Sequence, residues 1–243
     1  MTLTAPDTFK AVTWNVYHGT ETKELEPIAA NLQRKGVSLF LMQEAGGQDI
    51  TKMLRGLGLQ TFLHPRQYRV AWDPESWTEL GSEGVELSDQ PYWAKGGGNV
   101  QKSEAARTIL GDQLGRTLDV VSYHTPAHIQ VRDFPERRYI ATLESLATLA
   151  EMAEESHATA FLGGGDLNWD PDEGIQREAM TAAIKLGGLR LIQAPDATHG
   201  KRREIDHFHL VRGGKLRQVK GQGWVQDGGG DHRVHGQAFR WAA

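Results

Sequence analysis

The stretch "FLGGGDLNWD", residues 161–170, runs from two apolar residues through three glycines to an aspartate and an asparagine. The apolar start predicts a buried strand, and residues two apart in an extended chain point to the same side. We therefore expect Asp166 and Asn168 to project together from the strand end. A carboxylate that accepts a proton, next to a carboxamide that holds an anionic oxygen, indicates a hydrolytic site. The same pattern is also ordinary turn chemistry, so partners elsewhere in the chain must decide.

The composition is that of an ordinary folded domain. The chain has 243 residues, 39% hydrophobic and 24% charged, and we expect a single domain over residues 1–243. Its 27 Lys and Arg against 31 Asp and Glu give a formal charge of −4, which argues against a protein that coats nucleic acid through bulk positive charge. The absence of cysteine excludes disulfides, thiolate metal sites and cysteine nucleophiles. Because no segment has membrane-spanning length and no signal-peptide pattern is visible, we expect a cytoplasmic protein without a membrane partner.

Apolar patterns predict strands and helices in mixed order. Residues 8–16 alternate as a half-buried strand, and "VSLFLMQ", residues 37–43, reads as a fully buried one. A hairpin is expected around residues 111–116. Helical periodicity covers residues 24–35, 135–155 and 174–186, and a strand follows near 189–193. This order is too irregular for a βα barrel and fits sheets packed together with helices outside.

Polar residues recur where predicted apolar strands end, next to glycines or turns. Besides Asp166 and Asn168, they are Asn15 in "TWNVYHG", Glu44 in "FLMQEAGG", His124 in "VVSYHTPAH", Asp206 in "EIDHFHL", and Asp231 and His232 in "GGGDHRVH". Each alone has a structural explanation, because motif matches carry a real risk of false positives. Taken together, they predict one site if the strand ends converge.

In this order and at these spacings, the motifs resemble those of the endonuclease/exonuclease/phosphatase superfamily, whose fold is that of deoxyribonuclease I. The resemblance covers residues 9–241. It implies an α/β fold that is a four-layer sandwich, with two packed, mostly antiparallel β-sheets flanked by helices. It also implies hydrolysis of a phosphate ester with a divalent cation, Mg²⁺ or alternatively Mn²⁺.

The resemblance also implies roles for these residues. Glu44 would be the main metal ligand, with Asn15 beside it and Asp231 as a further contributor. Asp166 would orient or deprotonate the attacking water, and Asn168 would hold that water or a phosphate oxygen. Asp206 would fix the imidazole of His232, which would bind the phosphate together with His124 and assist proton transfer.

Three further residues bear on substrate specificity. Arg107 resembles, more loosely, an arginine that contacts the phosphate in deoxyribonuclease-like members. Tyr92 and Trp93 lie among cations in residues 91–107, a composition that suits base stacking but equally a flexible loop with a buried tryptophan. Histidine at position 124, where abasic-site endonucleases have asparagine, favours the other branches of the family.

The leading interpretation is a metal-dependent phosphodiesterase of nucleic acid, most readily a DNA nuclease, and a monomer by default. The alternative is a phosphatase or phosphodiesterase of small molecules or lipid headgroups, because one catalytic set serves both substrate classes. A non-catalytic binding protein on the same scaffold would be expected to lack some of the catalytic residues, all of which are present.

Overall fold

The computed structural model describes residues 7–64, 67–93, 100–127, 136–170, 177–199 and 204–242. Within them the chain forms two six-stranded sheets, and both sheets have the same series of parallel and antiparallel strand pairs. The first sheet has the order β11-β12-β1-β2-β4-β3, with bounds Leu216–Asp227, Arg233–Trp241, Thr8–Asn15, Val37–Gln43, Tyr68–Trp72 and Gln60–His64. The second has the order β5-β6-β7-β8-β10-β9, with bounds Thr78–Trp93, Val100–Gly111, Thr117–His124, Ala160–Asp166, Asp206–Val211 and Leu189–Ile192.

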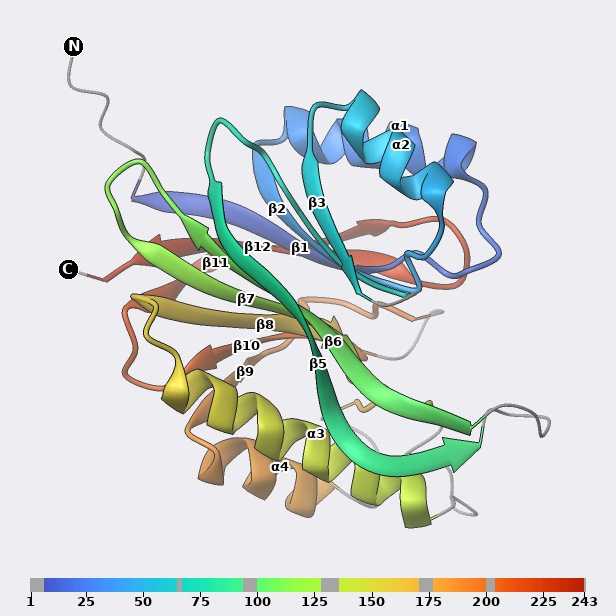
Figure 1. Cartoon of the computed structure of the whole chain (residues 1–243), viewed down its shortest axis with the longest axis vertical. Coiled ribbons are helices and arrows are strands. Elements are labelled where there is room, and N and C mark those ends of the chain that lie inside the picture. Colours follow the sequence, from blue (N-terminus) through green and yellow to red (C-terminus); the bar gives the residue numbers. More distant parts are fainter. Residues whose placement is uncertain are drawn as a thin grey trace.

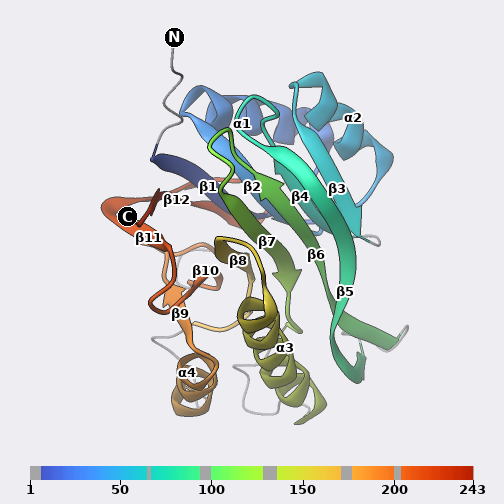
Figure 2. The ribbon, with the colours of Figure 1, turned by 60° about the vertical axis from the view of Figure 1, so that its left-hand side comes forward.

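Helices cover the outer faces of both sheets (Figures 1 and 2). Helices α1 (Thr22–Arg34) and α2 (Gln48–Gly56) lie on the first sheet, and α3 (Glu136–Glu155) and α4 (Arg177–Leu186) lie on the second. Only β1–β2 and β7–β8 pair in parallel, while the other eight adjacent pairs are antiparallel. The expected four-layer sandwich is confirmed.

Three apolar clusters hold the layers together. One cluster fills the space between the sheets. Each of the other two clusters lies between one sheet and the helices that cover it. The central cluster includes Leu41 from β2, Leu162 from β8, and Phe208 from β10, all fully buried. Burying side chains of this size contributes about 1.5–3 kcal/mol each. The two sheets are therefore held at a fixed separation, which is what a site built from both of them requires.

The glycines of the opening stretch serve this packing. A Cβ on Gly164 would lie 2.9 Å from Leu41 Cδ2 and 3.0 Å from the ring of Phe208. A Cβ on Gly165 would collide with the backbone carbonyl of Tyr123 on the neighbouring strand. Gly164 and Gly165 are thus needed for the close approach of neighbouring protein groups.

Strand pairing then places the polar strand ends together. In the parallel pairs, Asn15 is opposite Gln43, and His124 is opposite Asp166. Asp206, the first residue of β10, pairs with Asp166 from the other side. The carboxyl ends of four strands and the start of a fifth therefore meet at one end of the sandwich.

The predicted helices are present, with the first residues of the 135–155 and 174–186 predictions lying outside the described part of the chain. Helix α2 was not predicted from the sequence. No helix in the described ranges combines the length and the apolar character needed to cross a membrane.

Several histidines are buried in the sandwich. His209 and His235 are fully buried, and desolvation together with the charge of His207 lowers the pKa of each to about 3. Each ring has one polar partner, at 2.7 Å from the Tyr123 hydroxyl for His209 Nδ1 and 3.0 Å from the Asp206 carbonyl for His235 Nδ1. Both rings are therefore neutral in the folded protein at physiological pH.

This burial makes stability depend on pH. A histidine with a folded pKa of about 3 and an unfolded pKa near 6.5 costs nothing above pH 6.5, and stability is lost as the pH falls toward 3 because only the unfolded chain takes up the proton. At pH 5 the loss is about 2 kcal/mol per histidine. We expect His209→Gln to lower the difference in unfolding free energy between pH 8 and pH 5, measured with urea. The exposed His157→Gln control should leave the difference unchanged, and equal pH dependence in the two variants would contradict the assignment.

Candidate active site

Backbone strain gathers at the end of the sandwich where the strand ends meet. In the described part of the chain, three non-glycine residues have positive φ: Tyr17 (54°), Glu44 (55°) and Asn168 (50°). Each follows one of the strands β1, β2 and β8. Left-handed backbone is unfavourable for residues other than glycine and is often found at functional sites. The strain indicates that the backbone at these three residues is held in a conformation that directs their side chains toward this end of the sandwich.

Asp166 lies at the centre of this region and is 1% exposed. Its Oδ1 accepts a hydrogen bond from the Asn168 backbone at 2.8 Å, and its Oδ2 accepts one from Asn15 Nδ2 at 3.1 Å. The same Oδ2 lies 3.4 Å from His124 Nε2 and 3.7 Å from His232 Nε2. One carboxylate oxygen therefore meets residues of both sheets.

Asp206 and His232 form a buried pair beside Asp166. His232 Nδ1 lies 3.2 Å from Asp206 Oδ2, and Thr198 Oγ1 accepts the Asp206 backbone N–H at 3.1 Å. Burial raises the pKa of Asp206. Burial alone would lower the pKa of His232, but the carboxylates of Asp206, Asp166 and Asp231 raise it to about 10. Since both pKa values rise, the pair keeps one proton at neutral pH, and we place it on the imidazole.

Glu44 is the more open carboxylate, with a side chain 18% exposed. Oε1 accepts from Asn15 Nδ2 at 3.1 Å, and Oε2 accepts from the His18 backbone at 3.1 Å and lies 2.9 Å from His18 Nδ1. Burial acts to raise the pKa of Glu44, but the charge of His124 and the hydrogen bonds from His18 and Asn15 together lower it to about 2. Glu44 is therefore ionised and reachable from solvent.

Asn15 faces the carboxylates with its nitrogen. Its Oδ1 accepts the Tyr17 backbone N–H at 3.0 Å, so its Nδ2 points to Glu44 and Asp166. A cation requires the oxygen instead. In this arrangement Asn15 bridges and orients two carboxylates, and its role as a metal ligand stays a prediction that would require the amide to turn.

At the rim, Asp231 is exposed and lies 3.4 Å from His199 Nε2 and 4.0 Å from His232 Nε2. The rings of His199 and His232 meet edge to face, with centroids 4.7 Å apart. Asn168 Nδ2 lies 2.8 Å from His124 Nε2 and donates to the Thr125 carbonyl at 2.9 Å. Thus every predicted catalytic residue lies in one cluster, which we call the catalytic cluster and which comprises Asn15, Glu44, His124, Asp166, Asn168, Asp206, Asp231 and His232.

Two groups of side chains have a spacing suited to a metal ion: His199 with Asp231 and His232, and Asp166 with Asp206 and His232. Both groups include His232, and its imidazole would have to lose a proton before it could bind a metal ion. Glu44 belongs to neither group, yet it is the ionised oxygen donor that faces solvent. Magnesium keeps several waters and takes one or two carboxylates from a protein. The Glu44 carboxylate fits such an ion better than either group, because it is ionised and has solvent beside it for the waters of the ion.

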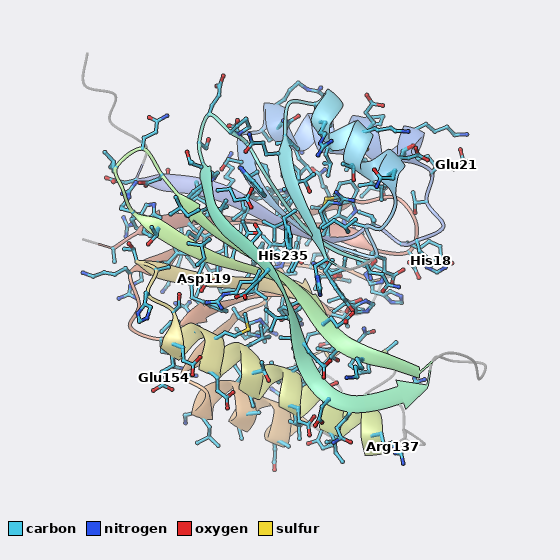
Figure 3. The ribbon with its side chains drawn as sticks, in the orientation of Figure 1. His18, Glu21, Asp119, Arg137, Glu154 and His235 are labelled. Atoms are coloured by element: carbon cyan, nitrogen blue, oxygen red, sulfur yellow. The ribbon has the colours of Figure 1, made fainter. Side chains whose placement is uncertain are left out.

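Arg107 is not part of the catalytic cluster. Its guanidinium lies 2.7 Å from Asp119 Oδ2 and 2.8 Å from Glu83 Oε1, in ion pairs among β5, β6 and β7. Asp119 and His18 lie on opposite sides of the molecule in Figure 3. The prediction that Arg107 contacts the phosphate is thus corrected, because neighbouring strands supply its carboxylate partners. The side chains of Tyr92 and Trp93 lie outside the described residues.

Three residues near this site were not predicted as site residues: Tyr17, His18 and His199. The signal that could have found them is adjacency, since Tyr17 and His18 follow Asn15 and His199 follows Thr198. The turns that bring these three residues to the site are not revealed by any local sequence pattern.

No protein-family model and no curated protein sequence matches the chain. Solved structures do. An endonuclease/exonuclease/phosphatase protein from Bacteroides vulgatus superposes with a TM-score of 0.74 at 12% identity, covering 96% of this chain and 99% of that one. TDP2 from D. rerio, complexed with a single-strand DNA product, gives 0.72 at 12% identity, covering 97% and 100%. A mannosyl-6-phosphatase from Bacteroides thetaiotaomicron gives 0.69 at 14% identity, covering 96% and 100%.

The chain has the fold of the endonuclease/exonuclease/phosphatase superfamily. The similarity extends over nearly the whole of each chain, so the fold that the sequence motifs implied is confirmed. Because the identities are low, the similarity speaks for the fold, while the chemistry must be argued from the catalytic cluster itself.

The contact between Asp206 and His232 predicts how substitutions of these two residues combine in this endonuclease/exonuclease/phosphatase fold. If Asp206 acts only by orienting and charging the imidazole, Asp206→Asn should cost less activity than His232→Ala. The double variant should lose much less than the product of the two single effects, because residues that act as one unit are not additive. Rates of phosphate ester hydrolysis for all four proteins measure this, and strictly multiplicative losses would refute the pairing.

Proposed function

We propose that the protein is a divalent-cation-dependent phosphoric ester hydrolase. The observation that carries the proposal is the position of Asp166 Oδ2, which lies within 3.1–3.7 Å of Asn15, His124 and His232. A carboxylate among two imidazoles and an amide can accept a proton from water while neighbouring groups hold an anionic phosphate.

The proposed reaction balances as a hydrolysis. The oxygen of water forms a bond to phosphorus, the ester P–O bond breaks, and the water proton passes to Asp166. The leaving oxygen takes a proton from an imidazole, and His232, with a pKa of about 10, carries one at neutral pH. Asn168, whose amide nitrogen donates to the Thr125 carbonyl, would hold the attacking water or a phosphate oxygen.

Glu44 would hold the cation, with Asp231 at the rim as a second contact. A bound Mg²⁺ or Mn²⁺ would offset charge on the non-bridging oxygens of the phosphate. Asn15 and His18 keep the Glu44 carboxylate oriented and ionised for this role.

Two substrate classes follow from this chemistry. The sequence favours nucleic acid, most readily DNA, and TDP2, a protein of similar fold, has been solved with a single-strand DNA product. The small-molecule class is favoured by one observation: within the described residues, no Lys or Arg side chain pairs with the catalytic cluster, and Arg107 is engaged elsewhere. A nucleic-acid enzyme ordinarily contacts several phosphates with such cations.

The first test removes the cation and its carboxylate. We expect EDTA to abolish hydrolysis of bis-p-nitrophenyl phosphate or p-nitrophenyl phosphate, and Mg²⁺ or Mn²⁺ to restore it. Glu44→Gln should lower the rate at least about a hundredfold, the scale of lost charge stabilisation. It should also lose the rise in melting temperature that Mg²⁺ gives the wild type. The exposed Glu24→Gln is the matched control, and full activity without a cation would refute the proposal.

The second test concerns Asp166. Asp166→Asn should lower turnover by roughly a hundredfold or more, the scale of general-base catalysis. Because Asp166 is buried and accepts from two donors, the new amide would face a donor, so the melting temperature should fall as well. A variant that melts lower but hydrolyses normally would assign Asp166 a purely structural role.

A further inference from the structure

A cleft of about 490 Å³ adjoins the catalytic cluster on the side of Glu44. It lies between the β1–α1 loop and the start of α2, and its lining includes Tyr17, His18, Glu21, Glu44, Asp49 and Gln67. We call it the Tyr17 cleft. Glu44 belongs both to this cleft and to the catalytic cluster, so a group esterified to a phosphate at the cluster has room to extend into it. Figure 3 shows His18 and Glu21 projecting on the same side of the molecule.

Tyr17 presents an aromatic ring to this cleft. The side chain is 40% exposed although its backbone is left-handed. The turn is fixed by the bond from Tyr17 N to Asn15 Oδ1 and by a bond from Thr20 N to the Tyr17 carbonyl, at 3.0 and 2.8 Å. A Cβ on Gly19 would lie 3.1 Å from the Tyr17 ring. The fixed turn holds the backbone, Gly19 leaves room for the ring, and the ring lies against that of His18 with centroids 4.9 Å apart, which places an exposed ring as a stacking surface requires.

The rest of the lining is rich in oxygen. Glu21, Glu44 and Asp49 are carboxylates, and Gln67 adds an amide. Lys23 and Lys52 pair with Glu21 and Asp49 at 2.6 and 3.6 Å, but these pairs are exposed and weak. None of the described lining residues is Lys or Arg. Such a surface repels further phosphates and accepts hydrogen bonds from hydroxyl groups.

We propose that the Tyr17 cleft binds the uncharged, polyhydroxylated part of a phosphate ester, as found in a sugar phosphate. One face of the sugar lies on the Tyr17 ring, and its hydroxyl groups donate to Asp49, Glu21 and Gln67. An extended polyanion is disfavoured in the same place by the carboxylates. The proposal deepens the proposed function and rests on it, since it names the substrate class of the same site.

The test compares substrates that do and do not reach the cleft. The probes are hexose and pentose phosphates, with p-nitrophenyl phosphate as a small generic ester and a short single-stranded deoxyoligonucleotide as the polyanion, all with Mg²⁺ or Mn²⁺. We expect sugar phosphates to be hydrolysed with a higher kcat/KM than the oligonucleotide. Tyr17→Ala should lower the ratio of kcat/KM for the best sugar phosphate to that for p-nitrophenyl phosphate about tenfold or more, mainly through KM.

Two further variants keep the test decisive if Tyr17→Ala folds poorly. Tyr17→Phe retains the ring and should retain the ratio, whereas Asp49→Asn should lower it by removing an acceptor's charge. The exposed Leu114→Ala, in the β6–β7 turn, is the control and should leave the ratio as in the wild type.

The outcomes separate the two proposals. If no phosphate ester is cut with either cation, the proposed function itself fails. If p-nitrophenyl phosphate is cut but the ratio is unaffected by both Tyr17→Ala and Asp49→Asn, the hydrolase stands and the Tyr17 cleft is not its sugar site. Preferred cleavage of the oligonucleotide would overturn the cleft assignment in favour of nucleic acid.

Discussion

Asp166 and Asp206 are paired across adjacent strands and are both buried, and this placement of two carboxylates side by side constrains everything around it. Two buried negative charges repel strongly and cannot both ionise without compensation. His232 provides it by lying against both, and His124 adds a second imidazole beside Asp166. Removing one member of such a group leaves an uncompensated charge, so the four residues depend on one another.

The constraint explains why both sheets are needed. His124, Asp166 and Asp206 come from the second sheet, whereas Asn15 ends a strand of the first and Glu44 follows another. The amide of Asn15 joins the two sets, because its nitrogen lies 3.1 Å from a carboxylate oxygen of Glu44 and 3.1 Å from one of Asp166. The central apolar cluster therefore fixes the distances on which the chemistry depends, although it lies away from the solvent.

The sequence indicated the strand ends well, because an apolar run followed by a polar residue is a local signal. Asp166 and His124 were predicted in this way, and strand pairing explains why they meet. Asp206 was also expected where an apolar strand ends, but it is the first residue of β10 and reaches Asp166 through antiparallel pairing. Arg107 was misplaced because its partners, Glu83 and Asp119, are chosen by the register of β5, β6 and β7, which no single segment shows.

Two other features were not predicted, for different reasons. The orientation of the Asn15 amide depends on the turn at Tyr17, which brings a backbone N–H back to its oxygen. Helix α2 carries its buried Ile50, Met53 and Leu54 at helical spacing, so its period can be read in the sequence and was overlooked. Long-range register and short, tightly turned segments are therefore the parts of this site that local patterns did not reveal.

The left-handed backbones at Tyr17, Glu44 and Asn168 have a consequence for how such a protein changes over time. Each could be relieved by glycine, which adopts this conformation without steric penalty, and roughly 1 kcal/mol or more of stability would be recovered at each position. Every such replacement would also delete a side chain of the site. Selection for a more stable fold and selection for catalysis therefore oppose each other at these three positions. A descendant protein that no longer needs catalysis would be expected to acquire glycine there first.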